Sequence, residues 1–307
     1  MIHSGARRGS VKNYGIRVAA MKANLLKGKP VAEAVLKDVS RRVAQLRKKG
    51  NIPGLGTILV GDDPASLGYI RKKHETCREY DIRSFDRRVP GSAGQAELLS
   101  VVREFNENPD VDAYLIQSPV PRGFDLNEAL LMVDPEKDAD GLTPVNLGRL
   151  VLQEPGPRPC TPSGIIAMLE HYKIPVEGRE VVVIGRGPTL GRPMALMFSL
   201  KMRGANAAVT MVHSAVPNAA ELTQRADILV AAVGSPGVVV PEMVKTGAVV
   251  ISGGISWRGR KLLPDVDESV GEVASWITPR VGGVGPTTVA LLLRNAVECA
   301  ERRRFNG

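Results

Sequence analysis

Residues 180–194 read EVVVIGRGPTLGRPM, and this segment carries the strongest indication of the fold. Its VVVI run is short, β-branched and uncharged, as expected of a strand buried on both faces of a parallel sheet. Gly185, Gly187 and Gly191 follow, and a helix is predicted from residue 190 to about 202. A glycine turn between strand and helix brings free backbone N–H groups to the positive end of a helix dipole, which suits a pyrophosphate. The G-x-G-x-x-x-G spacing is one residue longer than the usual dinucleotide fingerprint, so a plain tight turn is the alternative interpretation.

Strand and helix patterns continue to alternate after this stretch. Strands are predicted at 208–212, 228–233 and 248–252, with helical segments at 218–225 and 241–245 between them. Alternation with this period indicates a doubly wound parallel sheet of the Rossmann type. The fold class expected is therefore α/β, and the second half of the chain is expected to bind a dinucleotide.

The end of the strand at 208–212 bears on the choice of dinucleotide. Residues 211–214 read MVHS, without the Asp or Glu that usually holds the ribose hydroxyls of NAD. Arg186 lies inside the glycine turn and Arg192 follows it. Missing negative charge beside two guanidinium groups favours a 2′-phosphate, so NADP is the expected cofactor. The alternative is that both arginines are solvated loop residues.

The composition bounds the number of domains and the class of partner. A chain of 307 residues with 43% hydrophobic content is long enough for one large or two ordinary domains, each with its own core. The net charge of +9 permits an anionic ligand or nucleic acid, but much of the surplus lies at the two ends of the chain. Terminal basic runs are usually solvated tails, and aromatic residues, at 4%, offer few stacking platforms for bases, so no nucleic-acid partner is expected.

Cysteine use and the start of the chain bear on the compartment. Cys77, Cys160 and Cys299 are few and have no metal-like spacing, as expected in a reducing cytoplasm, and no metal site is predicted. No apolar run approaches the roughly 18 residues of a transmembrane span, so no membrane association is expected. Residues 1–20 carry four basic groups and no acid, which resembles a transit segment. A mobile tail, or a true start at Met21, is the interpretation favoured here.

The first half of the chain is also predicted to alternate between helix and strand. Apolar residues recur at helical spacing over 30–49, with Pro30 in the first turn and Gly50 at the C-terminal cap. Further strands are predicted at 57–60, 84–89 and 113–117, and further helices from about 66 to 80, at 93–108 and at 145–151.

Polar residues in this half mark a candidate site. Tyr69 and Lys73 lie four residues apart on a predicted helix, so the ring can border the site that holds the ammonium. The strand at 113–117 ends in Gln117 and is followed by Ser118, at a carboxyl end where open α/β sheets place their ligands. The alternative for Lys73 is an ordinary surface lysine, because two other basic residues precede it.

Six motifs occur in order along the chain and together carry a family resemblance. They are G-DDPAS-x-x-Y-x-x-x-K at 61–73, I-Q-x-P-x-P at 116–121, P-x-KD-x-DG-x-x-P-x-N-x-G at 135–148, P-CTP-x-G at 159–164, the glycine turn, and GGVGP-x-T at 282–288. The set resembles the bifunctional methylenetetrahydrofolate dehydrogenase/cyclohydrolase family, and the resemblance covers about residues 22–303.

The resemblance implies two domains with a cleft between them. A folate-binding catalytic domain would comprise residues 22–150 plus 286–307, and a Rossmann-like NADP domain residues 151–285, after a basic extension at 1–21. A C-terminal helix at 286–304 would return to pack on the first domain. Members of the family are commonly dimers, so a homodimer is expected.

The resemblance also implies the chemistry. A hydride leaves the methylene carbon that bridges two tetrahydrofolate nitrogens for the nicotinamide of NADP+, and water then adds to the methenyl carbon to give 10-formyltetrahydrofolate. A lysine suits both steps, because burial beside a cationic substrate lowers its pKa and lets it exchange protons near neutrality. By resemblance, Lys73 is this residue and Gln117 orients its amine. Tyr69 is similar to the tyrosine that stacks on the aminobenzoyl group, and Asp140 to the carboxylate that pairs with the guanidine-like edge of the pterin.

Further ligand contacts follow from the same resemblance. The loop 281–285 is similar to the family loop that closes over folate, where glycines let the backbone approach the ligand. For Asp140, a helix N-cap or turn residue is the alternative to a substrate contact. The substrate-binding residues implied are Ile116, Ser118, Val281, Gly282, Gly283, Val284 and Gly285, and the cofactor-binding residues implied are Gly185, Arg186, Gly187, Ser214 and Ile255.

Several positions depart from the family pattern. Gly187 stands where many members have Ser, Ser118 replaces a usual Leu, Thr143 a usual His, Arg280-Val281 a usual Val-Pro, and Thr287 a usual Met. These changes border the folate and phosphate sites without removing a catalytic group, which leaves open a divergent paralogue with one activity. Two classes of protein outside the family also stay open. One is another NADP dehydrogenase on a two-domain plan, such as a shikimate or amino-acid type, and the second is a basic nucleic-acid-binding protein whose binding would weaken steeply with salt.

Overall fold

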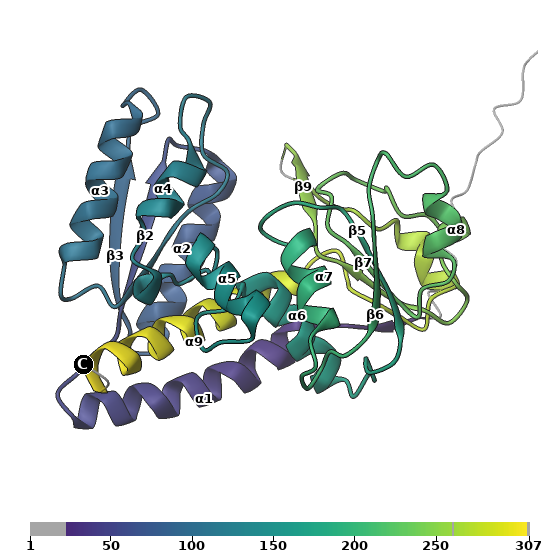
Figure 1. Ribbon diagram of the computed structural model, residues 1–307, viewed down its shortest axis with the longest axis horizontal. Helices are drawn as coiled ribbons and strands as arrows, with labels where there is room; N and C mark the ends of the chain where they lie inside the picture. Colours follow the sequence, from purple (N-terminus) through teal and green to yellow (C-terminus); the bar gives the residue numbers. More distant parts are fainter. Residues whose placement is uncertain (1–22, 260, 306–307) are drawn as a thin grey trace, which may run out of the picture.

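The computed structural model describes residues 23–259 and 261–305, and it shows two α/β lobes joined along one side by long helices (Figure 1). Each lobe has its own parallel sheet, and the last helix runs back from the second lobe to the first. This arrangement confirms the α/β fold class and the return of the C-terminal helix.

The first lobe is built on a three-stranded parallel sheet of order β3-β2-β4. The central strand β2 (Gly54–Val60) is buried along its whole length, and β3 (Arg83–Val89) and β4 (Ala113–Ile116) flank it. The helices that follow these strands are α2 (Pro64–Glu79), α3 (Gln95–Glu107) and α4 (Leu126–Met132), of which only α4 was not predicted from the sequence.

Strand β2 begins at Gly54 rather than at the predicted residue 57, because glycines open it and sequence rules treat glycine as a strand breaker. A side chain at Gly54 would place its Cβ 1.9 Å from the carbonyl oxygen of Asp110, and one at Gly56 would place it 2.6 Å from the Phe105 ring. The two glycines therefore allow β2 to pack closely against its neighbours.

The second lobe holds a six-stranded parallel sheet of order β1-β11-β8-β7-β5-β6. Strands β5 (Glu180–Ile184), β6 (Ala208–Val212), β7 (Ile228–Ala231) and β8 (Val249–Ser252) are those that the sequence predicted. Helices α7 (Gly191–Ser199) and α8 (Ala219–Thr223) connect them, which confirms the doubly wound pattern.

Three boundaries in this lobe differ from the prediction. Helix α7 ends at Ser199 instead of near residue 202, because Leu200 adopts an extended conformation. Strand β7 ends at Ala231 instead of residue 233, because the chain turns away there. The segment predicted as a short helix at 241–245 is a 3₁₀ turn, Pro241–Met243.

Several short elements had no signal in the sequence. Strands β1 (Asn24–Leu25) and β11 (Trp276–Ile277) have only two residues each and pair with one another at the edge of the large sheet. The hairpin β9 (Ile255–Arg258) and β10 (Lys261–Pro264) projects beside this sheet (Figure 1). Further 3₁₀ turns occur at Pro135–Lys137 and Glu268–Glu272.

Long helices connect the two lobes. Helix α1 (Gly28–Lys48) and helix α9 (Val284–Phe305) run side by side along the base of the molecule, and α6 (Cys160–His171) contacts both (Figure 1). Helix α5 (Pro144–Leu152) contacts α7 of the second lobe. Arg42 of α1 forms ion pairs with Glu298 at 3.2 Å and Glu301 at 2.5 Å on α9. At the far end of α9, Arg304 binds the buried carboxylate of Asp112 at 2.8 Å, which ties the helix to the first lobe.

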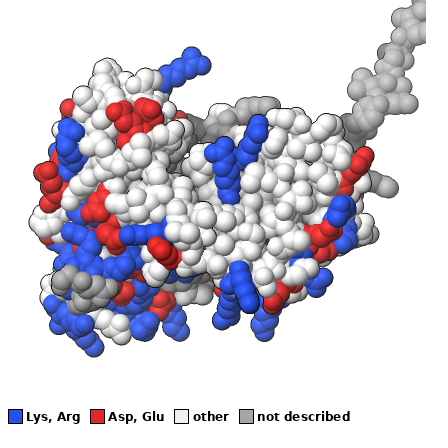
Figure 2. Space-filling model, viewed as in Figure 1, with Lys and Arg blue, Asp and Glu red and all other residues white. Residues whose placement is uncertain are grey.

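The basic residues of these helices are mixed with acidic ones on the face shown in Figure 2, where blue and red side chains alternate along the lower left edge. Lys29 pairs with Glu33 and Arg41 with Asp38 on α1. The surplus positive charge of this edge is therefore partly neutralised by neighbours. No helix within the described ranges is long and apolar enough to span a membrane.

Candidate active site

The amine of Lys73 is held inside the first lobe by α2. Asp63 is the N-cap of this helix, where its carboxylate accepts a hydrogen bond from the Ser66 amide at 2.8 Å, and Pro64 is the first helical residue. Lys73 lies on the inward face of this helix, and only 8% of the residue is exposed. Its Nζ donates a hydrogen bond to Oε1 of Gln117 at 2.9 Å.

Gln117 lies directly after β4, at the carboxyl end of the sheet. Its backbone amide donates to the Ile58 carbonyl at 2.8 Å, which keeps it in register with β2. Its side-chain Nε2 donates to the Ser118 carbonyl at 2.7 Å. Both ends of the amide are therefore fixed, and Oε1 must face the amine of Lys73.

The electrostatics of this site couple Lys73 to Asp140. Burial lowers the pKa of Lys73 from its ordinary value of 10.5, and the nearby Asp140 carboxylate opposes part of that shift. Burial likewise raises the pKa of Asp140, and Lys73 opposes it. The thiols of Cys77 and Cys160 lie close enough to interact with the amine, but burial raises the pKa of both, that of Cys77 to about 12. The thiols are therefore neutral at physiological pH.

A network of buried polar groups shapes the loop that carries Asp140. The carboxylate of Asp138, 2% exposed, accepts hydrogen bonds from the Gly141 amide at 2.8 Å, the Thr143 amide at 2.8 Å and Asn146 Nδ2 at 2.9 Å. Asn295 of α9 donates to the Ala139 carbonyl at 2.9 Å. Asp138 had no role assigned from the sequence, although its place in the KD-x-DG motif was a signal.

Thr143 caps the helix that follows this loop. Its hydroxyl accepts a hydrogen bond from the Asn146 amide at 3.3 Å at the start of α5, so Asp140 is not a helix cap. Thr143 stands where the family usually has His. Its buried side chain has a structural role here, because its hydroxyl binds the Asn146 amide.

The loop 281–285 lies where α1 and α9 begin. Gly282 has a φ of +77°, and its carbonyl accepts a hydrogen bond from the Gly28 amide at 2.8 Å. Val281 is 71% exposed, whereas the side chain of Val284 is buried in the apolar core of the second lobe. Ile116 is likewise buried, in the core beneath β2 and β4. The structure therefore leaves the backbone, and not these two buried side chains, free to meet a ligand.

The remaining residues of the first-lobe site differ in exposure. Tyr69 is half-buried on α2, one turn before Lys73, and Ser118 is exposed at the end of the sheet. Gly283 is buried and Gly285 is exposed at the start of α9. The structure thus brings Lys73, Gln117 and Asp140 together and places Tyr69 and Ser118 next to them in the chain.

The glycine turn after β5 fits a pyrophosphate. Gly185 has a φ of +109°, and a Cβ there would lie 2.3 Å from the Ala232 carbonyl oxygen. A Cβ at Gly191 would lie 2.4 Å from the Gly185 carbonyl oxygen, so glycine lets the start of α7 approach the turn. Gly187 has open space around it, and a serine at this position would fit. The Gly187 departure therefore removes a hydroxyl without changing the backbone.

Polar and apolar side chains border this turn at the carboxyl edge of the large sheet. Arg186 is exposed, with Nη1 3.4 Å from Nε2 of His213. Ser214 is exposed after β6, and Ile255, 39% exposed, follows β8. These residues come from the ends of three strands, β5, β6 and β8, so they share the edge where open α/β sheets bind ligands.

Comparison with known proteins decides the family. Residues 26–140 match the tetrahydrofolate dehydrogenase/cyclohydrolase catalytic domain, and residues 159–304 match the tetrahydrofolate dehydrogenase/cyclohydrolase NAD(P)-binding domain. The chain belongs to the tetrahydrofolate dehydrogenase/cyclohydrolase family. Lys73, Gln117 and Asp140 fall in the first matched segment, and the glycine turn falls in the second.

Relatives within this family are similar over almost their whole length. The bifunctional protein FolD of Syntrophotalea carbinolica is 67% identical over 283 residues, which are 92% of this chain and 98% of that protein. The crystal structure of the bifunctional enzyme FolD from Campylobacter jejuni has a TM-score of 0.86 at 36% identity, covering 92% of this chain and 99% of that one. The Trypanosoma brucei enzyme, solved with NADP cofactor and an inhibitor, has a TM-score of 0.85 at 36% identity, covering 92% and 98%.

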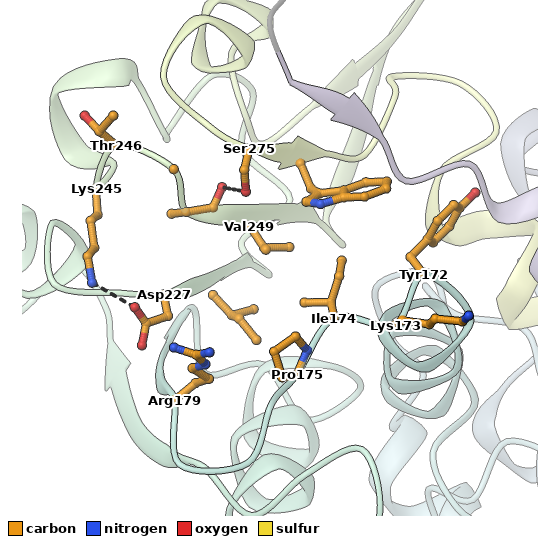
Figure 3. Close-up of a pocket in the computed structure, with 14 residues that line it drawn as sticks. Tyr172, Lys173, Ile174, Pro175, Arg179, Asp227, Lys245, Thr246, Val249 and Ser275 are labelled. Atoms are coloured by element: carbon orange, nitrogen blue, oxygen red, sulfur yellow. Dashed lines mark hydrogen bonds and ion pairs between the residues drawn. The ribbon is translucent and has the colours of Figure 1, made fainter.

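A separate hollow of about 360 Å³ lies at the opposite edge of the large sheet from the family's glycine turn (Figure 3). Its wall includes Tyr172, Ile174 and Val249, and its one carboxylate, Asp227, is paired with Lys245 at 2.7 Å. The hollow sits at the amino ends of β7 and β8, so it belongs to neither half of the candidate active site. Across residues 23–259 and 261–305, no group of His, Cys, Asp and Glu side chains could hold a metal ion.

Proposed function

We propose that this protein oxidises 5,10-methylenetetrahydrofolate to 5,10-methenyltetrahydrofolate with NADP+ and hydrolyses the product to 10-formyltetrahydrofolate. The observation that carries the proposal is the buried Lys73 amine, 2.9 Å from Gln117 Oε1 and coupled to Asp140. Family membership and the bifunctional relatives support it, and the Trypanosoma brucei neighbour was solved with NADP. An α/β dehydrogenase acting on an unrelated substrate would have no need of this polar set.

The lowered pKa of Lys73 serves both steps. Oxidation leaves a positive charge on the folate carbon, and a neutral amine does not repel that charge as an ammonium would. In the hydrolysis, the neutral amine can accept a proton from the attacking water and return it as the ring opens. Because one N–H of Lys73 points at Gln117, the amine lone pair is restricted to the two remaining positions around Nζ. When bound, NADP+ supplies the hydride acceptor.

Other residues of the first lobe would bind the folate. The half-buried Asp140 carboxylate suits the pterin edge, where two donors face a planar acceptor. Tyr69 would stack on the aminobenzoyl group, while Ser118, the Ile116 backbone and the loop 281–285 would line the rest of the substrate site. The glycines at 282, 283 and 285 suit a backbone that contacts a ligand directly.

In the second lobe, Gly185 and Gly187 would hold the pyrophosphate of NADP+. Arg186 and Ser214 would bind the 2′-phosphate, and Ile255 would lie beside the nicotinamide. We divide the chain functionally into residues 22–150 plus 286–307 for folate and 151–285 for NADP+, with the exception that β1 at Asn24–Leu25 joins the large sheet. A cytoplasmic homodimer completes the proposal, and the basic extension predicted at residues 1–21 lies outside the described residues.

The decisive assay supplies methylenetetrahydrofolate and NADP+ to the purified protein. NADPH and the methenyl chromophore should appear together, and the chromophore should then decay faster than it does without enzyme. NADPH formation with no accelerated decay would identify a paralogue with one activity and contradict the bifunctional proposal. No reaction with either folate would contradict the proposal entirely.

Replacing Arg186 with Gln is expected to raise the KM for NADP+ by about tenfold or more and to leave the KM for NAD+ nearly unchanged. The reason is the loss of a charge-assisted contact to the 2′-phosphate, which only NADP+ carries. Steady-state kinetics with both cofactors measure the difference, with Arg203→Gln as the control because the side chain of Arg203 is 91% exposed in the same lobe. A wild-type preference for NAD+, or an equal effect of Arg186→Gln on both cofactors, contradicts this role.

Hydrolysis should also depend on pH through Lys73. Since burial lowers the pKa of the amine, its neutral fraction and the hydrolysis rate should rise with pH through a midpoint below 10.5. The substitution Gln117→Glu would place a carboxylate beside the Lys73 ammonium, stabilise it, and move this midpoint to higher pH by about one unit or more. The uncharged Gln117→Met is the control and should not move it upward. An unchanged midpoint in Gln117→Glu would show that Lys73 is not the group whose titration sets the pH dependence of hydrolysis.

A further inference from the structure

The turn at residues 232–235 lies at the point where the large sheet reverses its strand order. The chain passes from β5 to β6 on one side and then crosses to β7 on the other side of β5. In open α/β sheets the ligand crevice forms outside the carboxyl ends of the strands at such a point. The turn that ends β7 is therefore one wall of the cofactor crevice, and the glycine turn that ends β5 is the other.

The two walls touch. The Ala232 amide donates to the Ile184 carbonyl at 2.8 Å, and the Ala232 carbonyl oxygen lies where a Cβ on Gly185 would have to sit. A shift of the turn at 232–235 would thus displace the backbone of Gly185. No helix follows β7 directly, so the turn needs another group to hold its amides.

Asp265 supplies that group. It follows β10 and is fully buried, and its Oδ2 accepts hydrogen bonds from the Val233 amide at 2.7 Å and the Gly234 amide at 3.0 Å. Its Oδ1 accepts from the Ser235 amide at 2.9 Å. Three successive amides pointing into one concavity form an anion-binding nest, and here the chain fills the nest with its own carboxylate.

Neighbouring groups close around this carboxylate. A Cβ on Gly254 would lie 2.0 Å from Asp265 Oδ2, so glycine is needed for the contact. The Ser256 hydroxyl donates to the Gly234 carbonyl at 2.7 Å and the Gly237 amide donates to the Pro264 carbonyl at 3.1 Å. Among the described residues, no Lys, Arg or His forms an ion pair with Asp265, and the three backbone amides stabilise its charge.

We propose that Asp265 is a positioning residue for NADP+: it holds the turn at 232–235 as the wall of the cofactor crevice and keeps the turn's amides away from the cofactor phosphates. The pyrophosphate is thereby directed to the glycine turn at 185–191. The proposal rests on the proposed folate and NADP+ function, but it concerns cofactor binding alone. Asp265 contacts neither the Lys73 site nor, on this account, the folate.

The test is Asp265→Asn, which keeps the shape of the side chain and turns one acceptor oxygen into a donor that faces amide donors. We expect the dissociation constant for NADP+, measured by calorimetry without folate, to rise by about tenfold or more, because at least one buried amide loses its partner. The KM for NADP+ should rise with it, while the KM for methylenetetrahydrofolate and the rate of methenyl hydrolysis stay within about twofold. Asp267→Asn, an exposed carboxylate two residues later, is the matched control and should bind NADP+ as the parent does.

Each other outcome has a defined meaning. Unchanged NADP+ binding in Asp265→Asn would overturn the proposal, and so would loss of NADP+ binding together with hydrolysis and the cooperative thermal transition, since Asp265 would then serve the fold as a whole. Absence of hydrolysis in the parent protein would contradict the proposed function instead, while the calorimetric comparison would still decide the role of Asp265.

Discussion

Replacing Lys73 with Met is expected to slow the hydrolysis of methenyltetrahydrofolate by about 100- to 10,000-fold, the contribution of a positioned acid–base group. Methionine has a similar length and suits a buried site, so the fold should be kept. The NADP+ dissociation constant should be unchanged, because the glycine turn lies in the other lobe. Hydrolysis is followed by the decay of the methenyl chromophore in single-substrate assays.

Lys72→Met is the control for Lys73→Met, because the Lys72 side chain is 66% exposed one residue earlier on the same helix. It should hydrolyse the substrate at nearly the parental rate. If Lys73→Met did so as well, Lys73 would not be the acid–base group and the proposed mechanism would be wrong.

Replacing Asp112 with Asn is expected to lower the free energy of unfolding by about 3 kcal/mol, the low end of the range for breaking a buried ion pair. The Asp112 carboxylate is 1% exposed and accepts from the Gly54 amide at 2.9 Å, Arg304 Nη2 at 2.8 Å and Arg303 Nη1 at 3.4 Å. The side chains of Arg303 and Arg304 are 27% and 21% exposed, so they keep some contact with water, which limits the loss. Urea unfolding followed by circular dichroism measures the change.

The control for Asp112→Asn is Asp110→Asn, which removes an exposed partner of Arg83 and should cost less than about 1 kcal/mol. If the urea midpoint of Asp112→Asn equalled that of Asp110→Asn, the ion pairs of Asp112 with Arg303 and Arg304 would not be needed to hold α9 in place. Because Asn295 of the same helix holds the Ala139 carbonyl, a loosened α9 should also weaken folate binding.

The sequence predicted the elements whose pattern is local. The VVVI run with its glycine turn, the apolar spacing of α1 and the strand at 208–212 each show in a single window, and each was confirmed. Strands β1 and β11 were not predicted because two residues carry no periodicity, and they exist only because they pair with each other and with β8. The start of β2 was predicted too late, because Gly54 and Gly56 look like strand breakers in the sequence. Glycine is needed at both positions because a side chain would clash with neighbouring residues, and this depends on tertiary packing.

In the candidate site, too, the residues that belong to sequence motifs were predicted, and those whose role depends on tertiary contacts were not. The motifs pointed to Lys73, Gln117 and Asp140, and the structure adds the hydrogen bond and the burial that shift the pKa of Lys73. Asp138 and Asp265 had no assigned role, because a carboxylate in a loop gives no sign of which amides will surround it. Ile116 and Val284 were implied as substrate-binding residues by resemblance, and because both side chains are buried in apolar cores, only their backbone atoms would make such a contact.

On the proposed mechanism, the Lys73 amine and the nicotinamide seated on the glycine turn serve one folate carbon from opposite sides. A crystal structure of the protein with NADP+ and an unreactive folate analogue tests it most directly. We expect Nζ of Lys73 and the nicotinamide ring to lie on opposite faces of the position that the bridging carbon occupies, with the pterin edge on Asp140. An analogue bound away from Lys73, or an amine and a nicotinamide on the same face of that carbon, would contradict it.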